Sequence, residues 1–305
     1  ICSPGIASFG YWAEQLIAES TGKEGKGILP VEGEPLGAAA VYGNDRLFVY
    51  LGLAGEHDDA LQGRLAALGT AGHPVAFITL DSSDDLGAEF YRWEFATAIA
   101  GVCFDINPFD EPNVQESKDN TNAVLAALPA NPTVAGRVGR GVGQGGDGVS
   151  VAGSGPAATP LAALAGWLNQ VRPGDYLAVM AYLPNDQPTN HALLGLRTAL
   201  RDVMHVATTV GFGPRFLHST GQFHKGGPST GAFIQVTCDD AEDAAVPDAP
   251  YSFGVLKRAQ ALGDYQALQR HGLRTIRLHL AGSPTERLAA LDRLTQALLA
   301  AKSGH

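Results

Sequence analysis

Runs of apolar residues alternate with amphipathic stretches along most of the chain. The run at 46–53 (RLFVYLGL) is almost continuously apolar, as expected for a strand that is buried on both faces of a sheet. The run at 74–80 (PVAFITL) has the same character, and residues 57–68 between the two runs have helical spacing. Strands that alternate with helices predict an α/β fold with a parallel sheet and right-handed crossovers.

Two further helices frame these strands. Residues 11–19 carry Trp12, Leu16 and Ile17 at helical spacing, and Gly22 follows as a residue suited to a helix end. Residues 86–100 (LGAEFYRWEFATAIA) predict a long helix directly after an acidic loop.

The same pattern restarts in the second half of the chain. Strands are predicted at 175–183, 215–219, 232–237 and 275–280. Helices are predicted at 188–210, 252–264 and 285–301. The order of strand, acidic loop and helix occurs in both halves, which indicates a diverged internal duplication and two related α/β units.

A glycine-rich stretch separates the halves. Residues 136–156 contain nine glycines and few apolar residues, which is typical of a linker or mobile loop. A phosphate-binding loop is less favoured, because the pattern GxxxxGK[ST] is absent. We therefore predict a first domain at 1–135, a linker at 136–160 and a second α/β domain at 161–305.

Composition excludes some classes of protein. The 305 residues are 45% hydrophobic and 17% charged, so a packed core is expected and long disorder is not. The net charge is −10 without a basic patch, which argues against nucleic-acid binding, and no apolar run is long enough to span a membrane. Three widely spaced cysteines fit a reducing compartment, and we predict a cytoplasmic protein.

Candidate chemistry begins in the segment 101–118 (GVCFDINPFDEPNVQESK). A proline-containing turn with Phe109 leads into a predicted helix that carries Lys118 in its first turns. Lys118 could reach an oxygen or phosphate of a substrate from there. The residues by themselves favour a solvated lysine beside Glu116 and Asp119.

The same segment resembles the active-site lysine signature of the glucose-6-phosphate isomerases. The resemblance gives Lys118 a catalytic role and makes Glu111 a substrate contact, although Glu111 stands where the family has Gln. Asn113 stands for Gly and Gln115 for Glu, which indicates an atypical branch. The residues in register with the signature are Gly101, Cys103 or its neighbour Val102, Phe104, Phe109, Asp110, Val114 and Lys118.

A second motif lies earlier, at 19–23 (ESTGK). Alone it reads as an ordinary helix end. It is similar to the Glu-Ser-x-Gly-Lys phrase that carries the catalytic base of the same isomerases, and it precedes the lysine segment as it does in them. The resemblance makes Glu19 the base and makes Ser20 and Lys23 substrate contacts.

The implied reaction is the interconversion of glucose 6-phosphate and fructose 6-phosphate. A base removes the proton on C2, which gives a cis-enediol, and returns it to C1; a carboxylate suits this shuttle. A nearby cation stabilises the developing oxyanion. The reaction requires no metal and no organic cofactor.

A third polar segment, 216–235 (FLHSTGQFHKGGPSTGAFIQ), is crowded with side chains that could hold a sugar or phosphate. A metal site is disfavoured because no third ligand follows at a clear spacing, and a purely structural histidine remains an alternative. His218 or His224 is the candidate for opening the sugar ring. The predicted substrate contacts here are Ser219, Thr220, Gln222 and Lys225.

This segment and 251–261 (YSFGVLKRAQA) are similar to the C-terminal extension of transaldolase–glucose-6-phosphate isomerase fusion proteins. The resemblance implies a doubly wound parallel sheet of the sugar-isomerase (SIS) type followed by a related unit. It also implies that N-terminal domains of the same polypeptide precede this chain, and that the second unit completes the site. A homo-oligomer is left open.

Two other functions are kept beside this one. A non-catalytic module of the same fold would bind a sugar phosphate without turnover. A nucleotide-dependent enzyme would use the glycine-rich stretch and is less favoured, for the reason given above.

Overall fold

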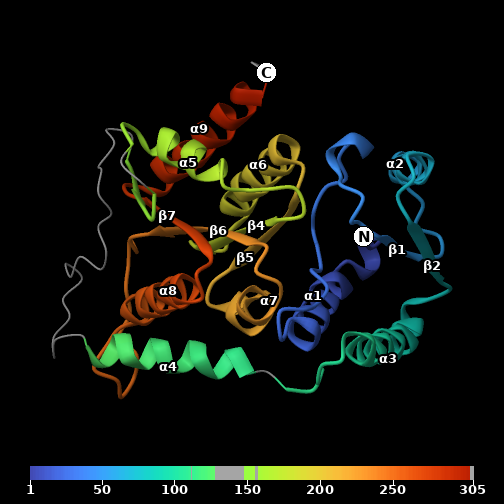
Figure 1. Cartoon of the computed structure of the whole chain (residues 1–305), viewed down its shortest axis with the longest axis horizontal. Coiled ribbons are helices and arrows are strands. Elements are labelled where there is room, and N and C mark those ends of the chain that lie inside the picture. Colours follow the sequence, from blue (N-terminus) through green and yellow to red (C-terminus); the bar gives the residue numbers. More distant parts are fainter. Residues whose placement is uncertain (111, 128–147, 155–156, 303–305) are drawn as a thin grey trace.

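The apolar runs become strands of two sheets in the computed structural model, which describes residues 1–110, 112–127, 148–154 and 157–302 (Figure 1). In the first sheet, β1 (Phe48–Leu53) pairs in parallel with β2 (Val75–Leu80). The second sheet has five strands in the order β3-β7-β6-β4-β5. The prediction of an α/β fold with parallel strands is confirmed.

In the second sheet the parallel strands are buried on both faces. All seven residues of β4 are buried, which explains its unbroken apolar run. The antiparallel strand β3 closes one edge beside β7. The strands are β3 (Val149–Ala152), β4 (Tyr176–Tyr182), β5 (Ala207–Phe212), β6 (Gly231–Cys238) and β7 (Arg274–Leu280).

Helices cover both faces of this sheet, as Figure 1 shows. Alternate residues of β4 point to opposite faces: Leu177 and Val179 enter one core, whereas Ala178 and Met180 enter the other. The first face is covered by α5 (Pro160–Leu168), α6 (Gln187–Met204) and α9 (Pro284–Lys302). The second is covered by α7 (Thr220–Gly226) and α8 (Phe253–Arg270).

The two-stranded sheet has helices on both faces as well. On one face, Leu51 and Leu80 pack with Phe9 of α1 (Ser8–Thr21) and with Trp93 of α3 (Leu86–Phe104). On the other face, Phe48 and Tyr50 pack with Leu65 and Leu68 of α2 (Asp59–Thr70). None of the helices in the described ranges combines the length and apolar character that a membrane crossing requires.

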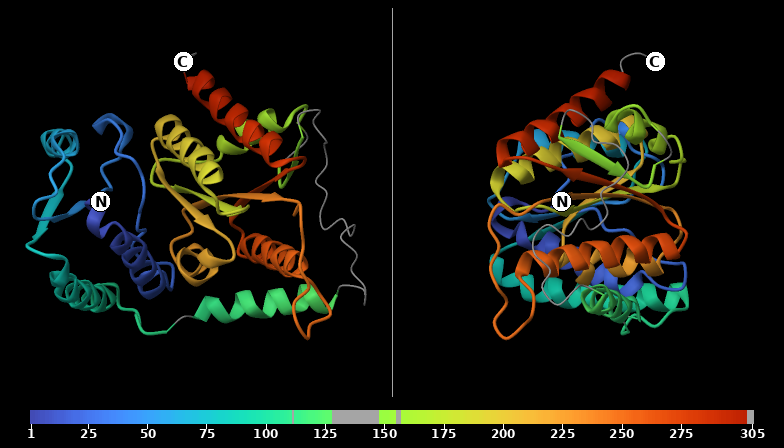
Figure 2. Two further views of the ribbon diagram at one scale, coloured as in Figure 1. Left: turned by 180° about the vertical axis from the view of Figure 1, so that it is seen from behind. Right: turned by 90° about the vertical axis from the view of Figure 1, so that its left-hand side faces the viewer.

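Helix α4 (Pro112–Ala126) packs against α8 and α7, and Figure 2 shows it lying beneath α8 along much of its length. It therefore joins the five-stranded unit in space, although it lies within the predicted first domain at 1–135. The domain boundaries remain a prediction.

The loop between α1 and β1 covers the outer edge of β5. Arg197 of α6 donates two hydrogen bonds to Thr208 O, from Nε at 3.1 Å and Nη2 at 2.8 Å, and a third from Nη1 to Glu32 O at 2.7 Å. Arg201 Nη1 donates to Pro35 O at 2.6 Å. The Thr208 hydroxyl of β5 donates to Glu34 Oε2 of the loop at 3.0 Å, so the loop is held beside the edge strand as well as against α6.

The prediction of a strand at 215–219 is wrong. Arg215–His218 forms a 3-10 helix (η4), with Phe216 and Leu217 buried in the core under the sheet. Short apolar runs do not distinguish a strand from a buried helical turn by periodicity. Other 3-10 helices in the described ranges are Pro4–Ile6, Ala39–Val41 and Ser83–Asp85.

The helix predicted at 188–210 is wrong over its last residues, which form β5. Helix α6 ends at Met204 because His205 takes a left-handed conformation (φ 56°). A glycine usually occupies such a position, so this helix end has no local signal in the sequence.

The linker predicted at 136–156 is wrong at 149–152, where β3 pairs with β7. Glycines on both sides concealed this short strand. The stretches 128–147 and 155–156 lie outside the described residues.

Candidate active site

Glu19 lies in the last turn of α1, where its carboxylate is half-buried. The side chain of Gln15 donates from Nε2 to Glu19 Oε2 at 3.4 Å. A carboxylate at the C-terminal end of a helix gains nothing from the helix dipole. Ser20, the next residue, is also half-buried.

Lys23 joins the Glu19 motif to the turn of the lysine segment. Its side chain is only 3% exposed, and Nζ donates to Asn107 O at 2.8 Å and to Asp110 O. The same Nζ forms an ion pair with Asp110 Oδ1 at 2.9 Å. Lys26 Nζ donates to Phe104 O at 2.7 Å and so satisfies a carbonyl at the end of α3. Two motifs separated by about eighty residues thus lie in contact.

Gln222, in α7, brings the third segment to the same place. Its Nε2 donates to Gly22 O and to Asn113 Oδ1, each at 2.9 Å, and its Oε1 accepts from Asn113 N at 3.0 Å. Gly25 N donates to Gly226 O at 2.9 Å. The segments that the sequence singled out therefore converge, with α7 between the end of α1 and the start of α4.

Most predicted site residues of the third segment are buried. His218 is exposed at the end of η4 and is open to solvent. The buried ones are Ser219, Thr220, Gln222, His224 and Lys225.

His224 is enclosed in an aromatic cluster. Its Nδ1 is hydrogen-bonded to the Tyr176 hydroxyl at 3.0 Å, and its ring stacks on Tyr176 and meets Phe233 edge-on. Burial, with a smaller effect of the neighbouring Lys225 charge, lowers the pKa of His224 to about 3. The imidazole is therefore neutral at pH 7 in the folded protein.

This burial predicts a pH dependence of stability. Because the pKa of His224 is about 3 when folded and 6.5 ordinarily, the unfolded chain takes up a proton that the folded chain does not. The contribution of His224 to the free energy of unfolding has its full value above pH 6.5 and decreases as the pH falls toward 3. We expect the free energy of unfolding, measured with urea between pH 6 and 4, to fall more steeply with decreasing pH in wild type than in His224→Asn. The difference in slope should be up to about 1.4 kcal/mol per pH unit. Equal slopes would contradict the burial.

Lys225 forms a buried ion pair with Asp264 of α8. Lys225 Nζ lies 2.6 Å from Asp264 Oδ1, and each side chain is 1% exposed. Within the described ranges, the carboxylate of Asp264 has no other hydrogen-bond donor. Asp264 was not among the predicted site residues; its signal in the sequence is an aspartate among the buried positions Ala261, Tyr265 and Leu268 of α8.

Lys118 is exposed on α4, five residues beyond the Asn113 contact. Asn113 Nδ2 donates to Glu116 Oε2 at 3.4 Å, and the Glu116 carboxylate also lies 3.1 Å from His271 Nε2 at the end of α8. Glu111, predicted as a substrate contact, lies outside the described residues. In the described ranges no three His, Cys, Asp or Glu side chains are placed to hold a metal ion.

Glu14 is a titratable residue that the sequence analysis did not single out. It lies in α1 and is 8% exposed; burial first, and then the charge of Glu32, raises the pKa of Glu14 to about 7. Arg215 and Arg197 oppose that rise. The signal was its place beside Ala13 on the buried side of the helix.

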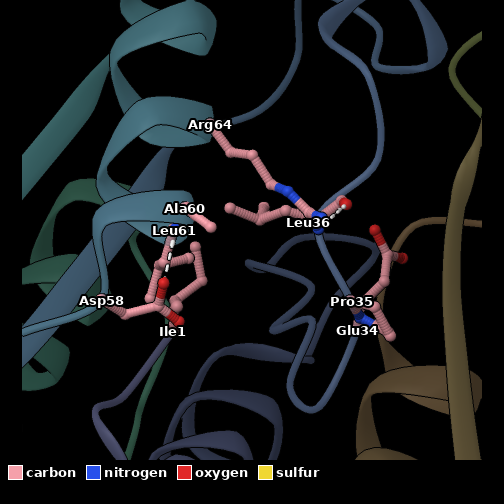
Figure 3. Close-up of a pocket in the computed structure, with 8 residues that line it drawn as sticks. All are labelled: Ile1, Glu34, Pro35, Leu36, Asp58, Ala60, Leu61 and Arg64. Carbon is pink, nitrogen blue, oxygen red and sulfur yellow. Dashed lines mark hydrogen bonds between the residues drawn. The ribbon is translucent and has the colours of Figure 1, made fainter.

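A cavity of about 300 Å³ lies away from these residues, between the α1–β1 loop and the start of α2 (Figure 3). Arg64 Nη1 donates to Leu36 O at 3.2 Å across it, and Asp58 caps α2 by accepting from Leu61 N at 3.0 Å. None of the predicted site residues lines it. The lining residues are Ile1, Glu34, Pro35, Leu36, Asp58, Ala60, Leu61 and Arg64.

Part of the chain is similar to curated glucose-6-phosphate isomerases. The enzyme of Leptospira biflexa serovar Patoc is 33% identical over 157 residues, which cover 39% of this chain and 35% of that enzyme. The enzyme of Streptococcus pyogenes serotype M5 is 32% identical over 158 residues, which cover 40% and 35%. The chain thus spans about 35% of the length of these relatives. Their names support the isomerase family and do not extend to a transaldolase fusion.

No family profile matches the chain. Among solved structures, a hypothetical protein from Thermus thermophilus aligns over 83% of this chain and 55% of that chain, with a TM-score of 0.40 and 16% identity. A likeness this remote carries no argument about the fold or the function.

Proposed function

We propose that the chain carries catalytic segments of a glucose-6-phosphate isomerase, which interconverts glucose 6-phosphate and fructose 6-phosphate. The observation that supports it best is the convergence of the three motifs. Lys23 bonds the Glu19 motif to Asn107 in the turn of the lysine segment, and Gln222 of α7 bonds to Gly22 and to Asn113. The relatives named glucose-6-phosphate isomerase support the same activity.

In this proposal Glu19 moves the proton between C2 and C1 through a cis-enediol. Lys118 provides positive charge for the oxyanion or the phosphate. His218 is the better candidate for opening the sugar ring, because it is exposed whereas His224 is enclosed. Ser20 is accessible enough to touch the sugar phosphate, and the other predicted contacts stay predictions.

Three further elements belong to the proposal. The isomerase would act in the cytoplasm, in sugar-phosphate metabolism. It would be the isomerase part of a transaldolase fusion, and N-terminal domains of that polypeptide would supply the rest of the substrate site. The second unit would take over the supporting role that a second subunit has in ordinary isomerases.

The direct test is conversion of fructose 6-phosphate in D₂O, followed by ¹H NMR. Glucose 6-phosphate should form with deuterium at C2, because a carboxylate that holds the proton on the enediol exchanges it with solvent. The assay is made on this chain and on the natural gene product, since the chain spans about 35% of its relatives. Conversion by neither would contradict the proposal. Binding of fructose 6-phosphate without conversion would instead favour the non-catalytic sugar-phosphate module.

A further inference from the structure

The side chain of Gln222 is hydrogen-bonded to the Glu19 motif and to the lysine segment. These bonds use both of its N–H donors and one of the two lone pairs on Oε1. Its amide nitrogen donates to Gly22 O and Asn113 Oδ1, and its amide oxygen accepts from Asn113 N. The side chain is 1% exposed. Gln222 therefore has no free N–H donor for a substrate. Its hydrogen bonds go to the end of α1 and to the start of α4.

The backbone around Gln222 is packed so closely that glycines are required. A Cβ on Gly22 would lie 2.4 Å from Phe223 Cα. A Cβ on Gly226 would lie 2.5 Å from Gly22 O and 2.6 Å from Asn113 Oδ1. Such distances are shorter than real contacts, so α7 and the end of α1 meet at backbone distance, and the Asn113 side chain of α4 is packed against α7.

We propose that Gln222 is a positioning residue, which holds the Glu19-bearing end of α1 and the Lys118-bearing helix α4 in one geometry. This inference rests on the proposed isomerase function. Gln222 was predicted as a substrate contact, and the inference gives it a different role: it acts through Glu19 and Lys118. A small misplacement of catalytic groups can cost about 100-fold in rate, so such a residue affects turnover without touching substrate.

The test compares Gln222→Met with a matched control, Gln235→Met. Gln235 is also 1% exposed and is bonded on both sides, donating to Ala261 O at 2.9 Å and accepting from Arg277 Nε at 2.7 Å. It lies in β6, at the end of the third segment, and within the described ranges its side-chain bonds go to α8 and β7 and not to the Glu19 motif or the lysine segment. Both variants keep the length of the side chain and lose its hydrogen bonds, so both should lower the free energy of unfolding.

Only Gln222→Met should lower kcat, by about 10- to 100-fold, with KM changed less than about threefold. It should also speed hydrogen exchange at the Asn113 amide by about tenfold, since that N–H loses its acceptor. Gln235→Met should leave both quantities within about twofold of wild type. Equal losses of kcat in the two variants, or unchanged exchange at Asn113, would overturn the positioning role.

A second variant, Gln222→Glu, keeps an acceptor for Asn113 N but turns a carboxylate oxygen toward Gly22 O. Protonation of that carboxyl restores a donor. The ratio of its kcat to that of wild type should therefore rise as the pH falls. A ratio independent of pH would contradict the inference. If wild-type protein shows no isomerisation, the proposed function fails; if wild type is active and Gln222→Met is too, the positioning role alone fails.

Discussion

Replacing Glu19 by glutamine is expected to lower isomerisation by roughly 10²- to 10⁴-fold, the range over which a positioned acid or base accelerates proton transfer. The amide has nearly the shape of the carboxylate, and Glu19 is only half-buried, so the fold should persist. Turnover is measured by conversion of fructose 6-phosphate, and binding of the sugar phosphate by calorimetry.

Glu14→Gln in the same helix is the matched control. Glu14 is more buried than Glu19, and the pKa of its carboxyl is raised to about 7. Neutralising it should leave turnover within a few-fold of wild type. Unchanged turnover in Glu19→Gln would exclude Glu19 as the base. A loss of binding equal to the loss of turnover would point to a structural defect.

Replacing Lys225 by methionine should lower the free energy of unfolding by about 3–5 kcal/mol. The reason is the Asp264 carboxylate, which would lose its ion-pair partner in the core; Lys225 Nζ now lies 2.6 Å from it. The measurement is urea unfolding at pH 7.

The double variant Lys225→Met with Asp264→Leu provides the control. Removing both charges leaves neither member of the pair to desolvate, and replacement of a buried pair by apolar side chains is often neutral or stabilising. The double variant should recover most of the lost stability. A single variant that loses under about 1 kcal/mol, or a double variant no better than the single one, would contradict a buried pair.

The sequence predicted the fold where the local pattern was strong. The apolar runs at 175–183 and 275–280 became β4 and β7, because strands buried on both faces need apolar residues at nearly every position. Strand β5 was missed because a histidine and not a glycine ends α6, and β3 because its four residues have little pattern of their own. Element ends set by tertiary packing leave no local mark in the sequence.

The candidate site was predictable in its segments but not in its contacts. The segments at Glu19, Lys118 and Gln222 were found because their residues resemble known signatures. The role of each polar side chain could not be predicted, because a glutamine that binds a ligand and a glutamine that bonds to the backbone look alike in sequence. Lys23 and Lys225 illustrate the difference, since both are buried and engaged within the protein.

The bonds of Gln222 have a consequence for the order in which the protein forms. Gly22 and Gln222 are 200 positions apart in the chain, so their contact closes a very long loop. Contacts of that separation form late, because much chain entropy is lost before they are made. During synthesis, the Glu19 segment leaves the ribosome long before α7 exists. The proposed catalytic geometry would therefore be completed only after most of the chain has been made, which would keep a partly synthesised chain inactive.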